Sequence, residues 1–104
     1  MVADHELDPK EVPARLQQGW QLVDVREPDE REAARIGDDL HIAMDELTER
    51  AAEVDRDRPV VFYCSVGNRS GLAAEAFRGA GYDAYNLAGG IEAWEAAGLP
   101  LERG

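Results

Sequence analysis

Hydrophobic residues recur along the chain with two spacings, and these spacings alternate. Short apolar runs rich in β-branched and aromatic residues predict buried strands, whereas apolar residues three or four positions apart predict helices. Strands are predicted at residues 21–25, 40–43, 60–64 and 82–87, and helices at residues 9–18, 28–34, 69–80 and 91–97 and after Asp45. Because strands and helices alternate, the pattern predicts an α/β fold with a parallel sheet flanked by helices on both faces.

Residues that begin and end helices support these boundaries. Asp8 is a suitable N-cap with Pro9 behind it, and Gly19 is expected to end the same helix. Pro13 lacks the N–H that a helix interior needs, so the first turn is expected to be irregular. Asp45 is predicted to cap the helix that follows it.

The composition is that of a soluble globular protein. With 104 residues, of which 44% are hydrophobic, the chain is expected to form one domain over residues 1–104. Its longest apolar run, residues 60–64, is far shorter than the roughly 20 residues of a membrane helix. The first residues lack the basic start and apolar stretch of a signal peptide, so we expect a cytoplasmic location.

The formal net charge of -11 limits the partners of the protein. Nucleic acids and anionic membranes attract basic surfaces, so neither is expected to bind. An acidic surface that keeps the protein soluble accounts for this composition, and adaptation to high salt or heat is left open.

The chain has a single cysteine, Cys64. It therefore has no internal disulfide, no C-x-x-C redox pair and no multi-cysteine zinc site. His41 has no second ligand at metal-binding spacing, so it is predicted to be structural. No metal and no other cofactor is expected, and any chemistry of Cys64 depends on one thiol.

Cys64 lies where an apolar strand ends and a short loop begins. The loop, Ser65 to Arg69, leads into a helix, so its N–H groups can converge on one point beside the positive helix end. Gly67 permits the tight curl, and Arg69 adds a positive charge suited to oxyanions. A lone cysteine at a strand end is often an inert apolar residue, but this loop favours a stabilised thiolate and predicts a nucleophile. Ser70 is predicted to cap or stabilise the first helical turn.

A second candidate segment follows the predicted strand at residues 21–25. Asp24 and Arg26 lie where that strand ends, and ligands bind at the carboxyl ends of parallel strands. Hydrogen bonds from these two side chains to neighbouring loops are the simpler explanation and are favoured.

Three motifs together resemble the rhodanese-like domain family of sulfurtransferases. The stretch Cys64-Ser-Val-Gly-Asn-Arg-Ser70 resembles the family's active-site loop, in which the active cysteine opens a short loop at the start of a helix. Asp24-Val-Arg-Glu-Pro28 resembles the family's D-V-R-E-P segment, and Leu87-Ala-Gly-Gly-Ile-Glu-Ala-Trp94 resembles its closing L-x-G-G-x-x-x-W segment. The motifs occur in the family's order and cover nearly the whole chain, so the resemblance implies a single rhodanese-like domain.

The resemblance implies persulfide chemistry. Cys64 would take a sulfane sulfur from thiosulfate or a persulfide and pass it to a thiophilic acceptor such as cyanide, a thiol or a protein thiol. Arg69 would attract the anionic donor, while Asp24 and Arg26 would brace the neighbouring loop. Gly89 and Gly90 would let the last turn pass close to the active loop. The backbone amides that would hold the persulfide are those of Ser65, Val66, Gly67, Asn68 and Arg69.

Two features depart from the family pattern. Residues 34–39 replace the G-H-I-P-G-A segment common among relatives, so its hydrogen bonds are not carried over. Val66 offers no side-chain donor in the loop, and a net charge of -11 repels a divalent anion. Thiosulfate is therefore expected to be a poorer donor than a protein persulfide.

Two other functions stay open. A sulfur-carrier or sensing module for a partner protein would keep the same cysteine with little turnover of its own. A cysteine phosphatase or arsenate reductase needs an arginine six positions after the cysteine, whereas Arg69 stands five positions after Cys64. The spacing therefore disfavours the phosphatase class and does not decide between enzyme and carrier.

Overall fold

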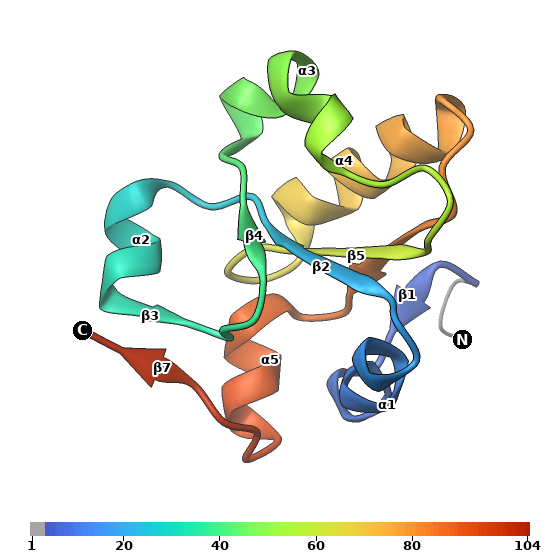
Figure 1. Cartoon of the computed structure of the whole chain (residues 1–104). Coiled ribbons are helices and arrows are strands. Elements are labelled where there is room, and N and C mark those ends of the chain that lie inside the picture. Colours follow the sequence, from blue (N-terminus) through green and yellow to red (C-terminus); the bar gives the residue numbers. More distant parts are fainter. Residues whose placement is uncertain (1–3) are drawn as a thin grey trace.

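The computed structural model describes residues 4–104 and contains two sheets (Figure 1). The central sheet has the strand order β1-β6-β5-β2-β4, and all its neighbouring strands are parallel. A second, antiparallel sheet pairs β3 with β7. The strands are β1 (Glu6–Leu7), β2 (Gln21–Asp24), β3 (Ala34–Arg35), β4 (Leu40–His41), β5 (Val60–Tyr63), β6 (Ala84–Leu87) and β7 (Glu102–Arg103).

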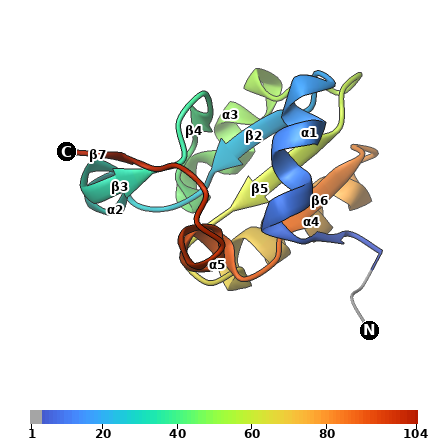
Figure 2. The same cartoon turned by 90° about the horizontal axis from the view of Figure 1, so that it is seen from below.

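Helices cover both faces of the central sheet, as Figures 1 and 2 show. One face carries α1 and α5, the other carries α3 and α4, and α2 lies beside β3. The α-helices are α1 (Val12–Gln17), α2 (Pro28–Ala33), α3 (Leu47–Arg50), α4 (Asn68–Gly79) and α5 (Gly90–Ala96), and the short 3-10 helices are Pro9–Glu11, Met44–Glu46 and Ala51–Glu53. The predicted α/β fold, a parallel sheet with helices on both faces, is confirmed.

The side chains of β5 alternate between two hydrophobic clusters, one on each face of the sheet. Val60 and Phe62 join the cluster beneath α3 and α4, and Cys64 continues on that side. Val61 and Tyr63 join the cluster with α1 and α5. Burial on both faces is why β5 is apolar throughout rather than alternating.

The segment after β4 differs from the prediction. Asp45 does not cap a helix: it lies inside the 3-10 helix Met44–Glu46, whose N-cap is Ala43. The Met44 N–H donates to the Val25 carbonyl at 3.1 Å, so the backbone is still tied to the sheet where the helix begins. The irregular first turn expected from Pro13 is confirmed, because a 3-10 turn precedes α1.

Three strands escaped prediction for one reason. β1, β3 and β7 each have two residues and no apolar run around them, whereas β4, also of two residues, continues into the apolar pair Ile42 and Ala43 and is predicted as 40–43. The segment 82–87, predicted to be the last strand, is therefore followed by another. Residues 1–3, on which the predicted absence of a signal peptide partly depends, lie outside the described part of the chain. From residue 4 onward, no helix has the length and apolar character needed to cross a membrane.

Candidate active site

The sulfur of Cys64 lies at the carboxyl end of β5, facing the first turn of α4. Three donors point at it: the N–H of Gly67 at 3.1 Å, the N–H of Ser70 at 3.4 Å and the hydroxyl of Ser70 at 3.2 Å. The cysteine itself is 1% exposed. These donors belong to the third and sixth residues after Cys64: Gly67 is within the predicted set Ser65 to Arg69, and Ser70 lies just beyond it.

Gly67 turns the chain from the loop into α4. It is the N-cap of that helix and has φ of 102°, a backbone angle that favours glycine. Its carbonyl accepts the N–H of Gly71 at 3.0 Å, which starts the helical ladder, while its own N–H remains directed at the sulfur. The predicted need for a glycine here is confirmed.

These surroundings change the acidity of the thiol. Burial acts to raise the pKa of Cys64, but hydrogen bonds from Ser70, Gly67 and Val66 to the sulfur outweigh it, so the pKa lies below its ordinary value. The thiolate is therefore more populated near neutral pH than that of an ordinary cysteine.

Of the two roles predicted for Ser70, capping is wrong, because Gly67 is the N-cap of α4. Ser70 lies fully buried within the first turn of α4, and its hydroxyl contacts both the Cys64 sulfur and the Asn86 side-chain oxygen, the latter at 2.6 Å. A hydroxyl has one proton, so it serves one acceptor at a time. When Cys64 is a thiolate, the hydroxyl can turn its proton to the sulfur.

Asn86 is held in one orientation by its own partners. Its amide nitrogen donates to the Gly67 carbonyl at 3.0 Å and to the Glu6 carboxylate at 2.9 Å, which leaves its oxygen facing Ser70. Because both of these partners are acceptors, the amide group is oriented by the network. Asn86 thereby joins β6 to the cysteine loop.

The turn before α5 passes directly over the loop, as predicted. The N–H of Ile91 donates to the Cys64 carbonyl at 2.9 Å, and the N–H of Glu92 donates to the Ser65 carbonyl at 3.1 Å. Gly90, with φ of 65°, makes this approach feasible, because a Cβ there would overlap both carbonyl groups. The turn before α5 is thus bound to the cysteine loop through main-chain hydrogen bonds.

Asp24 and Arg26 form a buried ion pair at the end of β2. Arg26 donates from Nε and Nη2 to the two Asp24 oxygens, each at 3.0 Å, and from Nη2 to the Ala34 carbonyl at 2.6 Å. Asp24 also pairs with Arg31 at 3.2 Å. These bonds hold the segment that contains α2, as the favoured explanation expected.

Arg69 is engaged by a residue that the sequence analysis did not single out. Its guanidinium makes a two-pronged ion pair with Glu30 of α2, at 2.8 and 2.9 Å. The hydroxyl of Ser65 donates to the same carboxylate at 2.8 Å. Ser65 and Arg69 therefore both bond Glu30, and the Arg69 guanidinium also lies close enough to the Cys64 sulfur to interact with it.

The remaining loop residues face outward. Val66 is 50% exposed and Asn68 is exposed at the first position of α4. Both line a polar hollow of about 430 Å³ that also includes Gly67 and Asn86. This hollow gives the outer side of the loop an opening to solvent.

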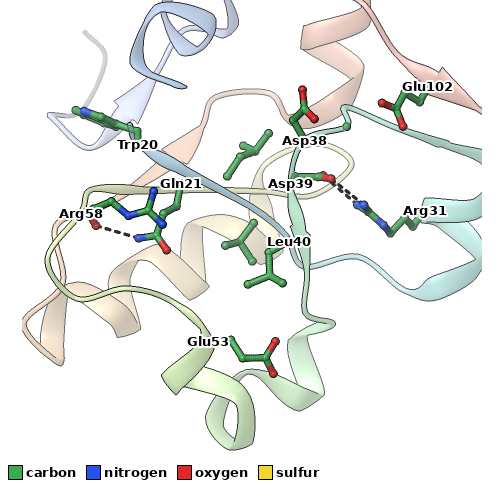
Figure 3. Close-up of a pocket in the computed structure, with 12 residues that line it drawn as sticks. Trp20, Gln21, Arg31, Asp38, Asp39, Leu40, Glu53, Arg58 and Glu102 are labelled. Atoms are coloured by element: carbon green, nitrogen blue, oxygen red, sulfur yellow. Dashed lines mark hydrogen bonds and ion pairs between the residues drawn. The ribbon is translucent and has the colours of Figure 1, made fainter. Parts of the chain in front are cut away.

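A different hollow, of about 440 Å³, lies at the edge of the central sheet beside β2 and β4 (Figure 3). Arg31 and Asp39 line it and satisfy each other at 2.7 Å. Its lining, as far as residues 4–104 define it, does not include the cysteine loop. Over the same residues, His, Cys, Asp and Glu side chains form no group arranged to hold a metal ion.

Glu30 and Asn86 are the two site residues that sequence reasoning missed. Asn86 carried a signal, because a polar residue between Tyr85 and Leu87 in a buried strand needs a polar partner. Glu30 carried none, since a carboxylate in the first turn of a helix is common and is usually exposed.

The protein is thus an α/β domain in which a cysteine at the end of a parallel strand is followed by a loop whose amides face its sulfur. The family model described as Rhodanese-like domain matches residues 8–97. The chain belongs to this family.

Individual relatives agree with this assignment. The chain is 37% identical over 89 residues to the thiosulfate sulfurtransferase GlpE of Pseudomonas syringae pv. syringae (strain B728a), covering 85% of this chain and 84% of that protein. It is 42% identical over 81 residues to a sulfurtransferase of Allochromatium vinosum, covering 77% and 76% of the two chains. The crystal structure of a rhodanese-related protein from Thermoplasma volcanium superimposes with a TM-score of 0.88 and 28% identity, covering 94% of this chain and 97% of that one.

Proposed function

We propose that the protein is a sulfurtransferase in which Cys64 carries the transferred sulfur as a persulfide. The observation that supports this best is the convergence of the Gly67 and Ser70 donors on the Cys64 sulfur, at 3.1 to 3.4 Å. Relatives named thiosulfate sulfurtransferase and sulfurtransferase support the same class of reaction.

In the first half of the cycle, the Cys64 thiolate attacks the sulfane sulfur of the donor. With thiosulfate, a new S–S bond forms, the sulfur–sulfur bond of the donor breaks, and sulfite leaves with the electron pair. The same N–H groups that hold the thiolate would hold the charge on the outer sulfur of the persulfide, because they converge on this side of the loop.

In the second half, a thiophilic acceptor attacks the outer sulfur. Cyanide would leave as thiocyanate and a thiolate would leave as a new persulfide, and in both cases the electron pair returns to the Cys64 sulfur. Asp24 and Arg26 brace the neighbouring segment during this cycle without contacting the sulfur.

Intact-mass measurement tests the proposal. After incubation with thiosulfate or cysteine persulfide, the wild-type protein should gain the mass of one sulfur atom, and cyanide should remove it. The Cys64→Ser variant should gain nothing. A wild-type chain that never gains this mass from any sulfane donor would rule the proposal out.

A sulfur-carrier role for a partner protein is the second candidate, and the burial of Cys64, at 1% exposure, is the observation that favours it. Discharge rates of the persulfide decide between the two. Multiple turnovers with cyanide or small thiols indicate an enzyme, whereas discharge only by a protein dithiol, such as a thioredoxin-like protein, indicates a carrier.

A further inference from the structure

The charge of Arg69, the one cationic side chain of the cysteine loop, is already matched within the protein. Both prongs of its guanidinium meet the Glu30 carboxylate, at 2.8 and 2.9 Å, and its Nη2 also lies 3.2 Å from the Ser65 hydroxyl. This planar, two-point geometry is the strong form of an arginine–carboxylate pair. A donor anion that used Arg69 would have to compete with a carboxylate that is covalently part of the site.

Glu30 is itself fixed by further donors. The Ser65 hydroxyl donates to one of its oxygens at 2.8 Å, and the N–H of Glu27 donates to the other at 2.9 Å. Hydrogen bonds from Arg69, with those from Glu27 and Ser65, lower the pKa of Glu30 to about 2 despite partial burial. The carboxylate is therefore ionised throughout the neutral range and stays beside Arg69.

The surrounding charges add to this effect. Glu75 and Glu6 line the hollow on the outer side of the loop against one cationic residue, Arg78, and Asp29 is exposed beside Glu30 on α2. The whole chain carries a formal net charge of -11. Thiosulfate, a dianion, thus approaches an arginine whose charge is already balanced by Glu30, on a protein with a negative net charge. A persulfide brings at most one negative charge to the reacting sulfur, so this repulsion is weaker for it.

We propose that Glu30 is a specificity-determining residue, which holds Arg69 and so favours persulfide donors over thiosulfate. This inference rests on the sulfurtransferase function proposed above. In the favoured reaction, the Cys64 thiolate attacks the outer sulfur of R–S–SH. One S–S bond forms to Cys64, the bond within the donor breaks, and R–S⁻ leaves with the electron pair while the proton stays on the transferred sulfur or passes to solvent.

The decisive variant is Glu30→Gln, which keeps the size and one acceptor oxygen of the side chain but removes its charge. We expect kcat/KM for thiosulfate to rise about three- to tenfold through a lower KM, the range for one partly exposed charge-assisted contact. The kcat/KM values for cysteine persulfide and for persulfidated albumin should change less than twofold. These two probes separate a small persulfide from a protein-borne one.

Glu32→Gln is the matched control, because Glu32 is an exposed residue of the same helix and its loss changes the net charge equally. It should leave the ratio of thiosulfate to persulfide activity within twofold of the wild type. If Glu32→Gln raises thiosulfate use as much as Glu30→Gln does, the overall field and not the ion pair sets the preference, and the inference is wrong.

The double variant Glu30→Gln with Arg69→Gln removes both charges together. If Glu30 balances the charge of Arg69 in the wild type, this double variant should keep the ratio of thiosulfate activity to persulfide activity within twofold of the wild-type ratio. A loss of thiosulfate activity in the double variant larger than its loss of persulfide activity would show that Arg69 already binds thiosulfate, which overturns the inference.

Failure of the inference and failure of the proposed function give different results. If the wild type gains sulfur on Cys64 but Glu30→Gln does not change the donor ratio, the specificity role is wrong and the sulfurtransferase stands. If no variant gains sulfur from any probe, the proposed function fails, and the donor preference fails with it. Thermal unfolding of each variant confirms that the comparison is made between folded proteins.

Discussion

Ser70 donates to the Cys64 sulfur through both its amide and its hydroxyl, at 3.4 and 3.2 Å. Only the hydroxyl can be removed by substitution without changing the backbone. Its proton has a second acceptor, the Asn86 oxygen at 2.6 Å, so its bond to sulfur strengthens when the thiol ionises. At the scale of single residues, Ser70 is thus the side chain that, beside the backbone amides, most lowers the pKa of Cys64 through its hydrogen bond.

The variant Ser70→Ala should raise the pKa of Cys64. The hydroxyl favours the thiolate, so its loss favours the thiol, and the expected rise is roughly half to one pH unit. The measurement is the rate of alkylation by iodoacetamide as a function of pH, whose midpoint reports the thiol pKa. The wild-type midpoint should lie below the ordinary value of 9.0 for this group, and the variant midpoint should lie above that of the wild type.

Ser65→Ala provides the comparison for this experiment. It is the same substitution in the same loop, but the Ser65 hydroxyl donates to Glu30 and not to the sulfur. The alkylation midpoint of Ser65→Ala should therefore shift from the wild-type value by less than half the shift of Ser70→Ala. Equal shifts in the two variants would mean that loop distortion, and not the lost hydrogen bond, changes the acidity.

Gly90 is a residue at which a side chain would meet backbone atoms of the cysteine loop. A Cβ would overlap the carbonyl groups of Ser65 and Cys64, and the φ of 65° adds strain for any other residue. We expect Gly90→Ala to lower the free energy of unfolding by about 2–4 kcal/mol, measured by urea denaturation. Gly98→Ala is the control, because Gly98 has a φ of 77° but nothing within 4 Å, so it should lose only about 1 kcal/mol. Equal losses would show that φ alone is responsible.

At the scale of elements, α2 is held to the molecule by polar contacts. None of its six residues is buried, so hydrophobic packing contributes little to its position. Arg31 pairs with Asp24 and Asp39 on one side, and Glu30 pairs with the cysteine loop on the other. The helix therefore links the end of β2 to the active loop through ionised side chains.

The contribution of Glu30 to stability should depend on pH. Its pKa is about 2 in the folded protein against an ordinary value of 4.5, chiefly because of Arg69. The stabilisation is thus fully present well above pH 4.5 and is lost as the pH falls toward 2. Urea denaturation at about pH 6 should show Glu30→Gln less stable than the wild type by about 1–2 kcal/mol, after allowance for partial exposure.

The difference between wild type and Glu30→Gln should shrink at about pH 3, since the wild-type carboxylate then begins to take up a proton relative to the unfolded chain. Glu32→Gln should show little difference at either pH, because Glu32 is exposed. A Glu30→Gln deficit that is the same at both pH values would mean that the variant disturbs packing and that the ion pair is not its cause.

At the scale of the whole molecule, a charge of -11 is carried by a body whose Cα radius of gyration is 12.4 Å. The Debye length falls from about 30 Å at 0.01 M salt to about 8 Å at 0.15 M. At low salt, acidic residues over the whole surface therefore repel an anionic donor that approaches Cys64. At higher salt, only charges near the loop remain effective.

Raising the salt concentration over that range should increase kcat/KM for thiosulfate about threefold or more, because screening weakens the repulsion of a dianion. Steady-state kinetics at several salt concentrations checks this. Alkylation of Cys64 by iodoacetamide, a neutral reagent, serves as the control and should stay constant. A decrease in thiosulfate activity with salt would show that the local field at the loop is attractive.

Much of the fold and the position of the candidate nucleophile were determined by the sequence alone. The order of strands and helices, the place of Cys64 at a strand end and the positive φ of Gly67 follow from residues close together in the chain. Hydrophobic spacing, turns and caps are local properties, so a linear pattern contains them. Asp45 shows the limit, because the 3-10 helix begins one residue earlier, at Met44, whose N–H bonds the carbonyl of Val25 from a distant part of the chain.

Only the tertiary structure decided what surrounds the cysteine loop. Glu30 and Arg69 are 39 residues apart, and Ser70 and Asn86 are 16 apart, so no periodic pattern pairs them. They meet because β2, β5 and β6 are parallel neighbours whose carboxyl ends share one edge of the sheet. The sequence therefore identified the nucleophile and its loop. The packing of the sheet decided that Glu30 pairs with Arg69 and that Asn86 bonds the Ser70 hydroxyl beside the sulfur.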